Sequence, residues 1–183
     1  MWLTAMKRKR AARIGQAVLP YLSQGARMID IGCGKGYTTE YLRGESKADI
    51  IGVDVINKLE VPLPFVLYDG VKLPFKDKEY DLGLFIFVLH HATDKLQLLS
   101  EARRVFRKVL VIEDVYTTIP GYLFTVVMDF LLNQGKGSVR FKTKEEWKEI
   151  FSEYGFLLLE MKEIRLGIFG PSRHCLFLLQ SAA

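Results

Sequence analysis

Short runs of mostly apolar residues alternate with helix-like segments along this chain. The runs cover residues 28–31, 49–53, 65–68, 82–89 and 109–112. Continuous apolar runs of this length are typical of strands that are buried on both faces of a parallel sheet. The segments between them include stretches long enough for the crossover connections that parallel strands require. The pattern therefore predicts an α/β fold.

Capping and breaking residues set the limits of the predicted helices. Pro20 weakens the last turn of an N-terminal helix, and Gly44 is expected to end a second one. Thr143 and Glu146 have the spacing of a capping box, which starts a later helix. The predicted helices cover residues 4–22, 37–43, 94–108 and 143–154, and two last strands cover residues 156–164 and 174–180.

A glycine-rich turn, residues 32–36, follows the first predicted strand. Without Cβ atoms its backbone can turn tightly and approach a ligand closely. The N–H groups of the helix start that follows favour anionic or oxygen-rich groups. A dinucleotide fingerprint is not met because Tyr37 stands at its third glycine, and a P-loop is not met because Gly36 follows Lys35. Asp30 would repel a pyrophosphate but can bind the ammonium group of an amino acid.

With Asp30, Gly32, Gly34 and Gly36, the chain resembles the class I S-adenosylmethionine-dependent methyltransferases, whose first motif reads acidic-x-G-x-G-x-G. The resemblance implies a three-layer, doubly wound, Rossmann-like sheet, mostly parallel with an antiparallel last strand. It also implies S-adenosylmethionine as cofactor, an in-line transfer of its methyl group, and S-adenosylhomocysteine as product. The overall pattern is similar to that of the quinone-biosynthesis C-methyltransferases.

Acidic residues end the second and third predicted strands. A carboxylate in this position, here Asp54, can accept hydrogen bonds from both hydroxyls of a ribose; the bland alternative is a surface acid that begins a loop. In the family this acid holds the ribose, Val55 packs on the adenine, and Asp69 accepts a hydrogen bond from the adenine amino group. The resemblance thus implies a cofactor site made of Asp30, Gly32, Gly34, Gly36, Asp54, Val55, Asp69, Gly70, Ile86 and Phe87, the last two beside the methionine part.

Catalytic residues are not singled out by the sequence. The methyl donor is already activated, so the main tasks of the protein are alignment and exclusion of water. A base is needed only if the acceptor loses a proton during transfer. The candidates, which follow the fourth and fifth predicted strands, are His90, His91, Asp114 and Tyr116. No His, Cys, Asp or Glu spacing suits a metal ion, and none is predicted.

Two segments have open roles. Residues 1–22 hold five Lys or Arg and no acid, while the rest of the chain carries as many cations as acids. This basic helix is either a solvated face or a contact for anionic lipid, nucleic acid or an acidic substrate; Arg10 and Arg13 alternatively turn inward over the cofactor. Residues 115–142 are mainly apolar and form core, a lid-like insertion over a greasy substrate, or a dimer face.

Length predicts one domain over residues 1–183, and the resemblance implies that it is a methyltransferase domain. The two cysteines and the lack of an apolar leader favour a reduced, cytoplasmic compartment. The Asn-Pro-Pro-Tyr and Pro-Cys motifs of nucleic-acid methyltransferases are missing, so a small-molecule or lipid-like acceptor leads and a nucleic-acid partner is disfavoured. Peripheral membrane contact is one of the open roles of the basic helix. The alternatives are an RNA-directed methyltransferase and a non-catalytic protein that binds S-adenosylmethionine; the oligomeric state is left open.

Overall fold

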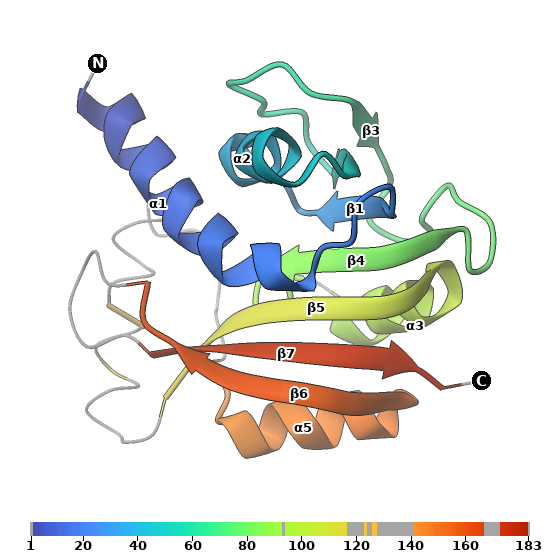
Figure 1. Cartoon of the computed structure of the whole chain (residues 1–183). Coiled ribbons are helices and arrows are strands. Elements are labelled where there is room, and N and C mark those ends of the chain that lie inside the picture. Colours follow the sequence, from blue (N-terminus) through green and yellow to red (C-terminus); the bar gives the residue numbers. More distant parts are fainter. Residues whose placement is uncertain are drawn as a thin grey trace.

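The computed structural model describes residues 2–92, 94–116, 141–166 and 173–182, together with 123, 126 and 127. Its centre is a seven-stranded sheet with the strand order β3-β2-β1-β4-β5-β7-β6 (Figure 1). Strands β1 to β5 are parallel, and β7 is antiparallel to both β5 and β6. The strands are β1 (Arg27–Ile31), β2 (Asp49–Asp54), β3 (Phe65–Leu67), β4 (Tyr80–Ile86), β5 (Phe106–Val115), β6 (Phe156–Ile164) and β7 (Arg173–Ser181). The predicted sheet with an antiparallel last strand is confirmed.

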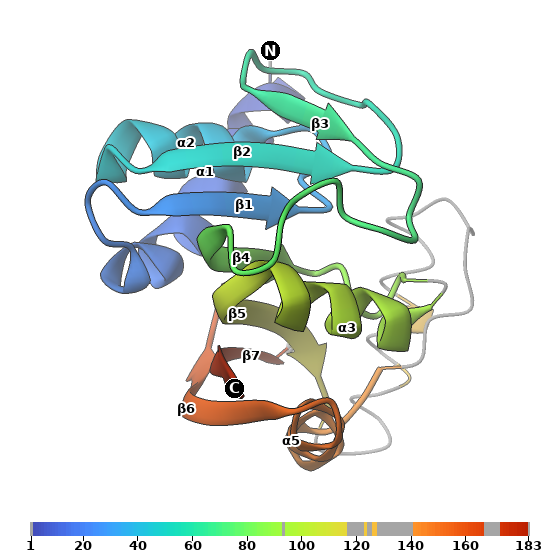
Figure 2. The ribbon, with the colours of Figure 1, turned by 90° about the vertical axis from the view of Figure 1, so that its right-hand side faces the viewer.

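Helices cover both faces of this sheet, α1 and α2 on one face and α3 and α5 on the other (Figure 2). Neighbouring residues of a strand point to opposite faces. Met28 therefore packs in one buried cluster with Leu42 of α2, and Ile29 packs in the other with Leu99 of α3. The helices are α1 (Trp2–Val18), continued by the 3-10 turn η1 (Leu19–Tyr21), α2 (Tyr37–Ser46), α3 (Lys95–Val105) and α5 (Lys144–Glu153).

Successive strands are added to the sheet in one direction from β1 to β3 and in the opposite direction from β4 onward, so the order reverses between β1 and β4. Strands β2 and β3 lie on one side of β1, and β4 and β5 lie on the other. In open sheets of this kind, ligands bind beyond the carboxyl ends of the strands at such a reversal. The turns that follow β1, β2 and β4 are therefore the place to look for a site.

Predicted bounds in the first half of the chain differ most at three elements. The helix predicted over residues 4–22 is α1 over Trp2–Val18, followed by the 3-10 turn to Tyr21. Helix α2 does not stop at Gly44 but continues to Ser46, and Lys47 then adopts a left-handed φ of 55°. The strand predicted over residues 82–89 is shifted, because β4 begins at Tyr80 and ends at Ile86. Phe87 leaves the strand with a left-handed φ of 58°, which is strained for a bulky side chain.

The junction of α3 and β5 also differs from the prediction. The helix ends at Val105 rather than at residue 108, and β5 begins directly at Phe106. Phe106 is fully buried, and its ring contacts those of Tyr80 and Phe85 with centroids 6.5 and 6.3 Å apart. A Cβ at Gly83 would lie 2.6 Å from the Phe106 ring, so the strand beneath leaves room for it. Packing of this ring therefore explains why β5 begins at Phe106, before the predicted start at residue 109.

The C-terminal elements follow the prediction. The Thr143 hydroxyl accepts a hydrogen bond from the Glu146 N–H at 3.2 Å, and the Glu146 carboxylate accepts one from the Thr143 N–H at 2.6 Å, which completes the capping box. Most of the apolar segment 115–142, for which core, a lid-like insertion and a dimer face are the predicted alternatives, lies outside the described residues. In the part of the chain that the structure describes, no helix is long and apolar enough to cross a bilayer.

Candidate functional site

The glycine turn joins β1 to α2 with a backbone that other residues would not readily adopt. Gly32, Gly34 and Gly36 have φ values of 68°, 55° and 83°, all in the left-handed region. A Cβ at Gly32 would lie 2.6 Å from Val88, and one at Gly36 would lie 2.5 Å from Leu63. The alternating glycines thus let the turn pack closely between the loop after β4 and the loop before β3.

Asp54, at the end of β2, is held against this turn. Its Oδ2 atom accepts a hydrogen bond from the Gly34 N–H at 2.9 Å, and its Oδ1 atom accepts one from the Val55 N–H at 2.7 Å. The residue is half-buried. A carboxylate has about four acceptor positions, so Asp54 can still accept hydrogen bonds from a ligand. The geometry therefore brings together two predicted site elements from different strands.

Asp30 lies within β1, just before the turn, and is 2% exposed. The Thr39 hydroxyl donates a hydrogen bond to its Oδ2 atom at 2.5 Å. Burial raises the pKa of Asp30 to about 7; the hydrogen bond from Thr39 opposes this rise, and the negative charge of Asp54 adds to it. A nearby cation would lower the pKa again, so this carboxyl group is suited to receive an ammonium group.

A cavity of about 230 Å³ lies between α1 and the glycine turn. Beside it, the Glu60 carboxylate pairs with Lys7, whose Nζ atom lies 2.8 Å from Oε2, and with Lys35. It also accepts a hydrogen bond from the Tyr37 hydroxyl at 2.8 Å. These partners, Lys35 first, lower the pKa of Glu60 to about 2. Helix α1 is thus tied across the turn through one carboxylate. The cavity is lined by Lys7, Arg10, Ala11 and Ile14 of α1 and by residues 33 and 35–38.

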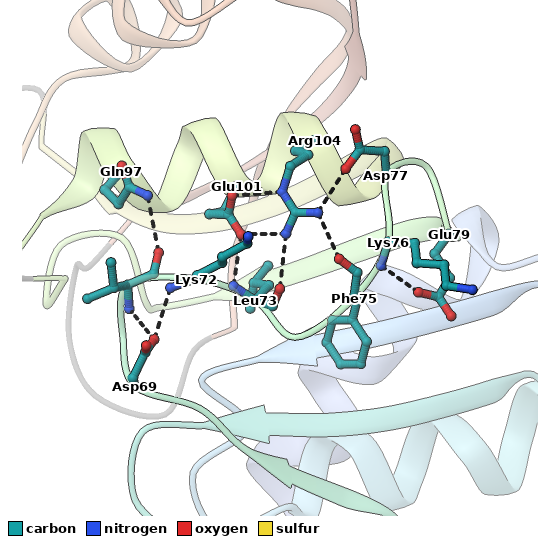
Figure 3. Close-up of polar contacts among 11 residues, drawn as sticks. Asp69, Lys72, Leu73, Phe75, Lys76, Asp77, Glu79, Gln97, Glu101 and Arg104 are labelled. Carbon is teal, nitrogen blue, oxygen red and sulfur yellow. Dashed lines mark hydrogen bonds and ion pairs between the residues drawn. The ribbon is translucent and has the colours of Figure 1, made fainter.

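The predicted adenine-binding residues meet where β2 and β3 end. A Cβ at Gly70 would lie 3.2 Å from Val55, whose side chain is 48% exposed. The Asp69 Oδ1 atom accepts hydrogen bonds from the N–H groups of Val71 and Lys72 at 2.8 and 2.9 Å, which lower the pKa of this exposed carboxyl group (Figure 3). Asp69 lines an open groove of about 610 Å³ rather than the cavity under α1.

The loop after Asp69 is fastened to α3. Glu101 Oε2 accepts a hydrogen bond from the Leu73 N–H at 2.8 Å (Figure 3). Arg104 donates to the Leu73 and Phe75 carbonyls at 3.0 and 2.7 Å and pairs with Glu101 at 2.6 Å. The segment Leu73-Pro74-Phe75 is therefore positioned by a polar network of Glu101 and Arg104.

The loop after β4 is organised by Glu113, a residue that the sequence analysis did not select. Glu113 is fully buried at the end of β5, and its Oε1 atom accepts the N–H groups of Val88 and Leu89 at 3.1 and 2.7 Å. Its Oε2 atom pairs with Nδ1 of His90. An acid at the end of an otherwise apolar strand was the signal that could have identified it, because a buried carboxylate requires partners.

The candidate bases do not form a single group. His90 is buried against Glu113. His91 is exposed, and the centroids of the two histidine rings lie 4.0 Å apart. Asp114 binds Nδ1 of His174 at 2.7 Å, while Tyr116 is half-buried. The geometry therefore singles out no base.

Phe87 lies between groups from distant parts of the chain. The ring of His174 meets the Phe87 ring edge-on with centroids 5.3 Å apart, and the Arg10 guanidinium lies 5.3 Å from the Phe87 ring centre. Of the two residues predicted beside the methionine part, Ile86 ends β4, and Phe87, which follows it, lies beside the Arg10 side chain that lines the cavity.

Comparisons with known proteins agree with this geometry. Residues 29–109 match a family model described as a methyltransferase domain. The chain is 27% identical over 109 residues to the mitochondrial arginine-hydroxylase NDUFAF5 of Homo sapiens, a match that covers 56% of this chain and 32% of that protein. It is 25% identical over 182 residues to the demethylmenaquinone methyltransferase of Staphylococcus saprophyticus, covering 80% of this chain and 77% of that protein. The chain thus spans about a third of the first relative.

Solved structures share the fold. A chain from the Haloferax volcanii complex of the Trm112 methyltransferase activator with a methyltransferase superposes with a TM-score of 0.76 at 17% identity, covering 97% of this chain and 91% of that one. Geranyl diphosphate C-methyltransferase from Streptomyces coelicolor, solved with S-adenosylhomocysteine, has a TM-score of 0.69 at 10% identity, covering 92% and 79%. At these identities the likeness concerns the fold.

Proposed function

We propose that this chain, which belongs to the methyltransferase domain family over residues 29–109, is an S-adenosylmethionine-dependent methyltransferase. The observation that carries the proposal is the contact between the glycine turn and Asp54, in which the Gly34 N–H donates to Oδ2 at 2.9 Å. This contact presents a carboxylate with spare acceptor positions beside a backbone free of Cβ atoms. The pair suits a ribose and the amino-acid chain attached to it.

The surrounding residues fit the rest of this cofactor. Val55 offers an exposed apolar surface for the adenine, and Asp69 keeps its Oδ2 atom for the adenine amino group. Asp30 would bind the ammonium group. When bound, S-adenosylmethionine supplies a methyl group that is already activated on a positively charged sulfur. The work left to the chain is to align the acceptor with that methyl group and exclude water, which can contribute roughly 7–11 kcal/mol.

The acceptor in this proposal is a small or lipid-like molecule. The demethylmenaquinone methyltransferase is named for a lipid-like acceptor, which supports this class. A carbon or oxygen acceptor that must lose a proton would need a base, and His90, His91, Asp114 and Tyr116 remain the candidates. The two free cysteines, Cys33 and Cys175, favour a reduced cytoplasmic setting.

A transfer assay tests the proposal. The protein is incubated with methyl-labelled S-adenosylmethionine and an apolar cell extract, and label is sought in the organic phase. Wild type should label an apolar product and release S-adenosylhomocysteine, whereas Asp54→Ala should not. The assay is repeated with an aqueous extract. If the protein releases no S-adenosylhomocysteine with either extract, an enzymatic role is contradicted and a non-catalytic binding protein is favoured.

An RNA acceptor is the second candidate, because the basic helix could contact phosphates. Two of its cations are engaged within the chain: Lys7 pairs with Glu60, and Arg8 pairs with Glu40 at 2.5 Å. Pairing reduces the charge that is available for a nucleic acid or an anionic membrane. RNA binding whose affinity falls steeply with salt would favour this candidate over a small acceptor.

A further inference from the structure

Strand β7 brings to the site edge of the sheet a histidine that is not one of the four candidate bases. Because β7 is antiparallel to β5, its first residues lie at the carboxyl end of β5, and His174 stands opposite Asp114. His174 also stands opposite Ile164, which packs in one buried cluster with Ile14 of α1. Directly opposite residues of an antiparallel pair share a face. His174 therefore lies on the face that α1 covers, at the edge where ligands bind in sheets of this kind.

Asp114 fixes the state of this histidine. Its Oδ1 atom lies 2.7 Å from Nδ1 of His174. A carboxylate only accepts hydrogen bonds, so the contact assigns the proton of the neutral ring to Nδ1 and leaves the lone pair on Nε2. In the part of the chain that the structure describes, no hydrogen bond engages Nε2. The pair thus presents a proton acceptor, and Asp114 would stabilise the positive ring after proton uptake.

The second carboxylate–histidine pair of the site has different surroundings. The side chains of His90 and Glu113 are 3% and 0% exposed, whereas those of His174 and Asp114 are 12% and 20% exposed. Glu113 also accepts two backbone N–H groups, which makes its pair part of the framework of the loop after β4. A substrate therefore reaches His174 more readily than His90.

His174 lies close to the cavity under α1 without lining it. Its ring meets the Phe87 ring edge-on with centroids 5.3 Å apart, and the Arg10 guanidinium lies 5.3 Å from the same ring. Arg10 lines the cavity, and His174 does not. Phe87 is held there with a left-handed φ of 58°, and backbone strain of this kind clusters at functional sites. The histidine is thus next to the residue predicted beside the methionine part but outside the cofactor cavity, as an acceptor site requires.

We propose that His174, held by Asp114, is the base that takes the proton of the methyl acceptor. The proposal rests on the proposed function and narrows the acceptor to one whose methylated oxygen or carbon carries a proton. As the acceptor atom forms its bond to the methyl carbon, the methyl–sulfur bond breaks and its electron pair stays on sulfur. The proton of the acceptor passes to Nε2 of His174 and from there to water.

Replacement of His174 by Gln tests the proposal in two assays. Methyl transfer to the apolar extract should fall about a hundred- to ten-thousandfold, the usual contribution of a base. Binding of S-adenosylhomocysteine, measured by calorimetry, should stay unchanged because His174 does not line the cavity. Imidazole added to His174→Gly should restore part of the transfer, which a ring that only supported the fold would not explain. Arg173→Gln is the matched control, since Arg173 is the exposed neighbour on the opposite face of β7, and this variant should keep both properties.

Nitrogen-15 NMR of the imidazole rings tests the pair without turnover. The chain has three histidines, so their signals can be resolved. Neutral His174 should carry its proton on Nδ1 in the wild-type protein, and Asp114→Ala should shift the proton toward Nε2. A wild-type ring that carries its proton on Nε2 would overturn the proposal.

The outcomes separate the proposal from the function beneath it. If the wild type transfers methyl groups and His174→Gln does so equally well, the proposal is wrong. If His174→Gln loses binding of S-adenosylhomocysteine together with transfer, the residue supports the structure of the site and the proposal is also wrong. If the wild type transfers no methyl group to either extract, the enzymatic function itself fails and the proposal with it.

Discussion

Replacement of Asp30 by Asn should stabilise the folded protein at neutral pH. Burial raises the pKa of Asp30 to about 7 in the folded state, against about 3.9 in an unfolded chain. Between these values the folded state holds a proton that the unfolded state has released, so the free energy of unfolding falls as the pH rises. Three pKa units correspond to about 4 kcal/mol, of which about 2 kcal/mol falls between pH 5 and pH 7.

Urea unfolding without ligand measures this effect. Asn keeps an oxygen for the Thr39 hydroxyl but cannot ionise, so the stability of Asp30→Asn relative to wild type should rise by about 3 kcal/mol from pH 5 to pH 8. Asp69→Asn is the control with the opposite sign: backbone N–H groups lower the pKa of Asp69, so its carboxylate stabilises the fold above the unfolded pKa and loses this effect in acid. An Asp30→Asn variant that tracks wild type at both pH values would refute the reasoning.

Three further predictions concern single contacts. Gly36→Ala should cost about 2–4 kcal/mol of unfolding free energy and weaken ligand binding, because of its left-handed φ of 83° and the 2.5 Å approach to Leu63; an unchanged melting curve would contradict this. Glu113→Ala should cost about 3–5 kcal/mol by stripping His90 of its buried partner, whereas Glu113→Gln should cost clearly less in urea unfolding; equal losses would disprove the assigned contacts. Thr143→Ala should cost about 1 kcal/mol by thermal denaturation, through loss of the capping box; no loss would show that the cap is not used.

The position of the site could be predicted from sequence because it depends on local patterns. The turn at residues 32–36 and the acid Asp54 each follow an apolar run, and parallel strands end at the same edge of a sheet. The contact of Gly34 with Asp54 is a consequence of that rule. The cofactor roles of the individual residues stay predictions until a ligand is measured.

The parts that sequence could not predict depend on tertiary contacts. The apolar run at residues 82–89 predicts one strand, yet its last part is a loop held by the hydrogen bonds that the N–H groups of Val88 and Leu89 donate to Glu113. Apolarity reports burial, and burial does not require a strand. Likewise Arg10 interrupts the apolar stripe of its helix, but its place over Phe87 follows from the packing of α1 across the sheet.

The central claim is that the glycine turn and Asp54 bind an adenosyl amino acid and not a dinucleotide. Calorimetric titration of the wild-type protein with S-adenosylhomocysteine and with NAD tests it most directly, with Asp54→Ala as the variant. The account predicts binding of S-adenosylhomocysteine alone, weakened about ten- to a hundredfold in Asp54→Ala. Binding of NAD in its place, or no binding of S-adenosylhomocysteine at millimolar concentration by the folded protein, would contradict it.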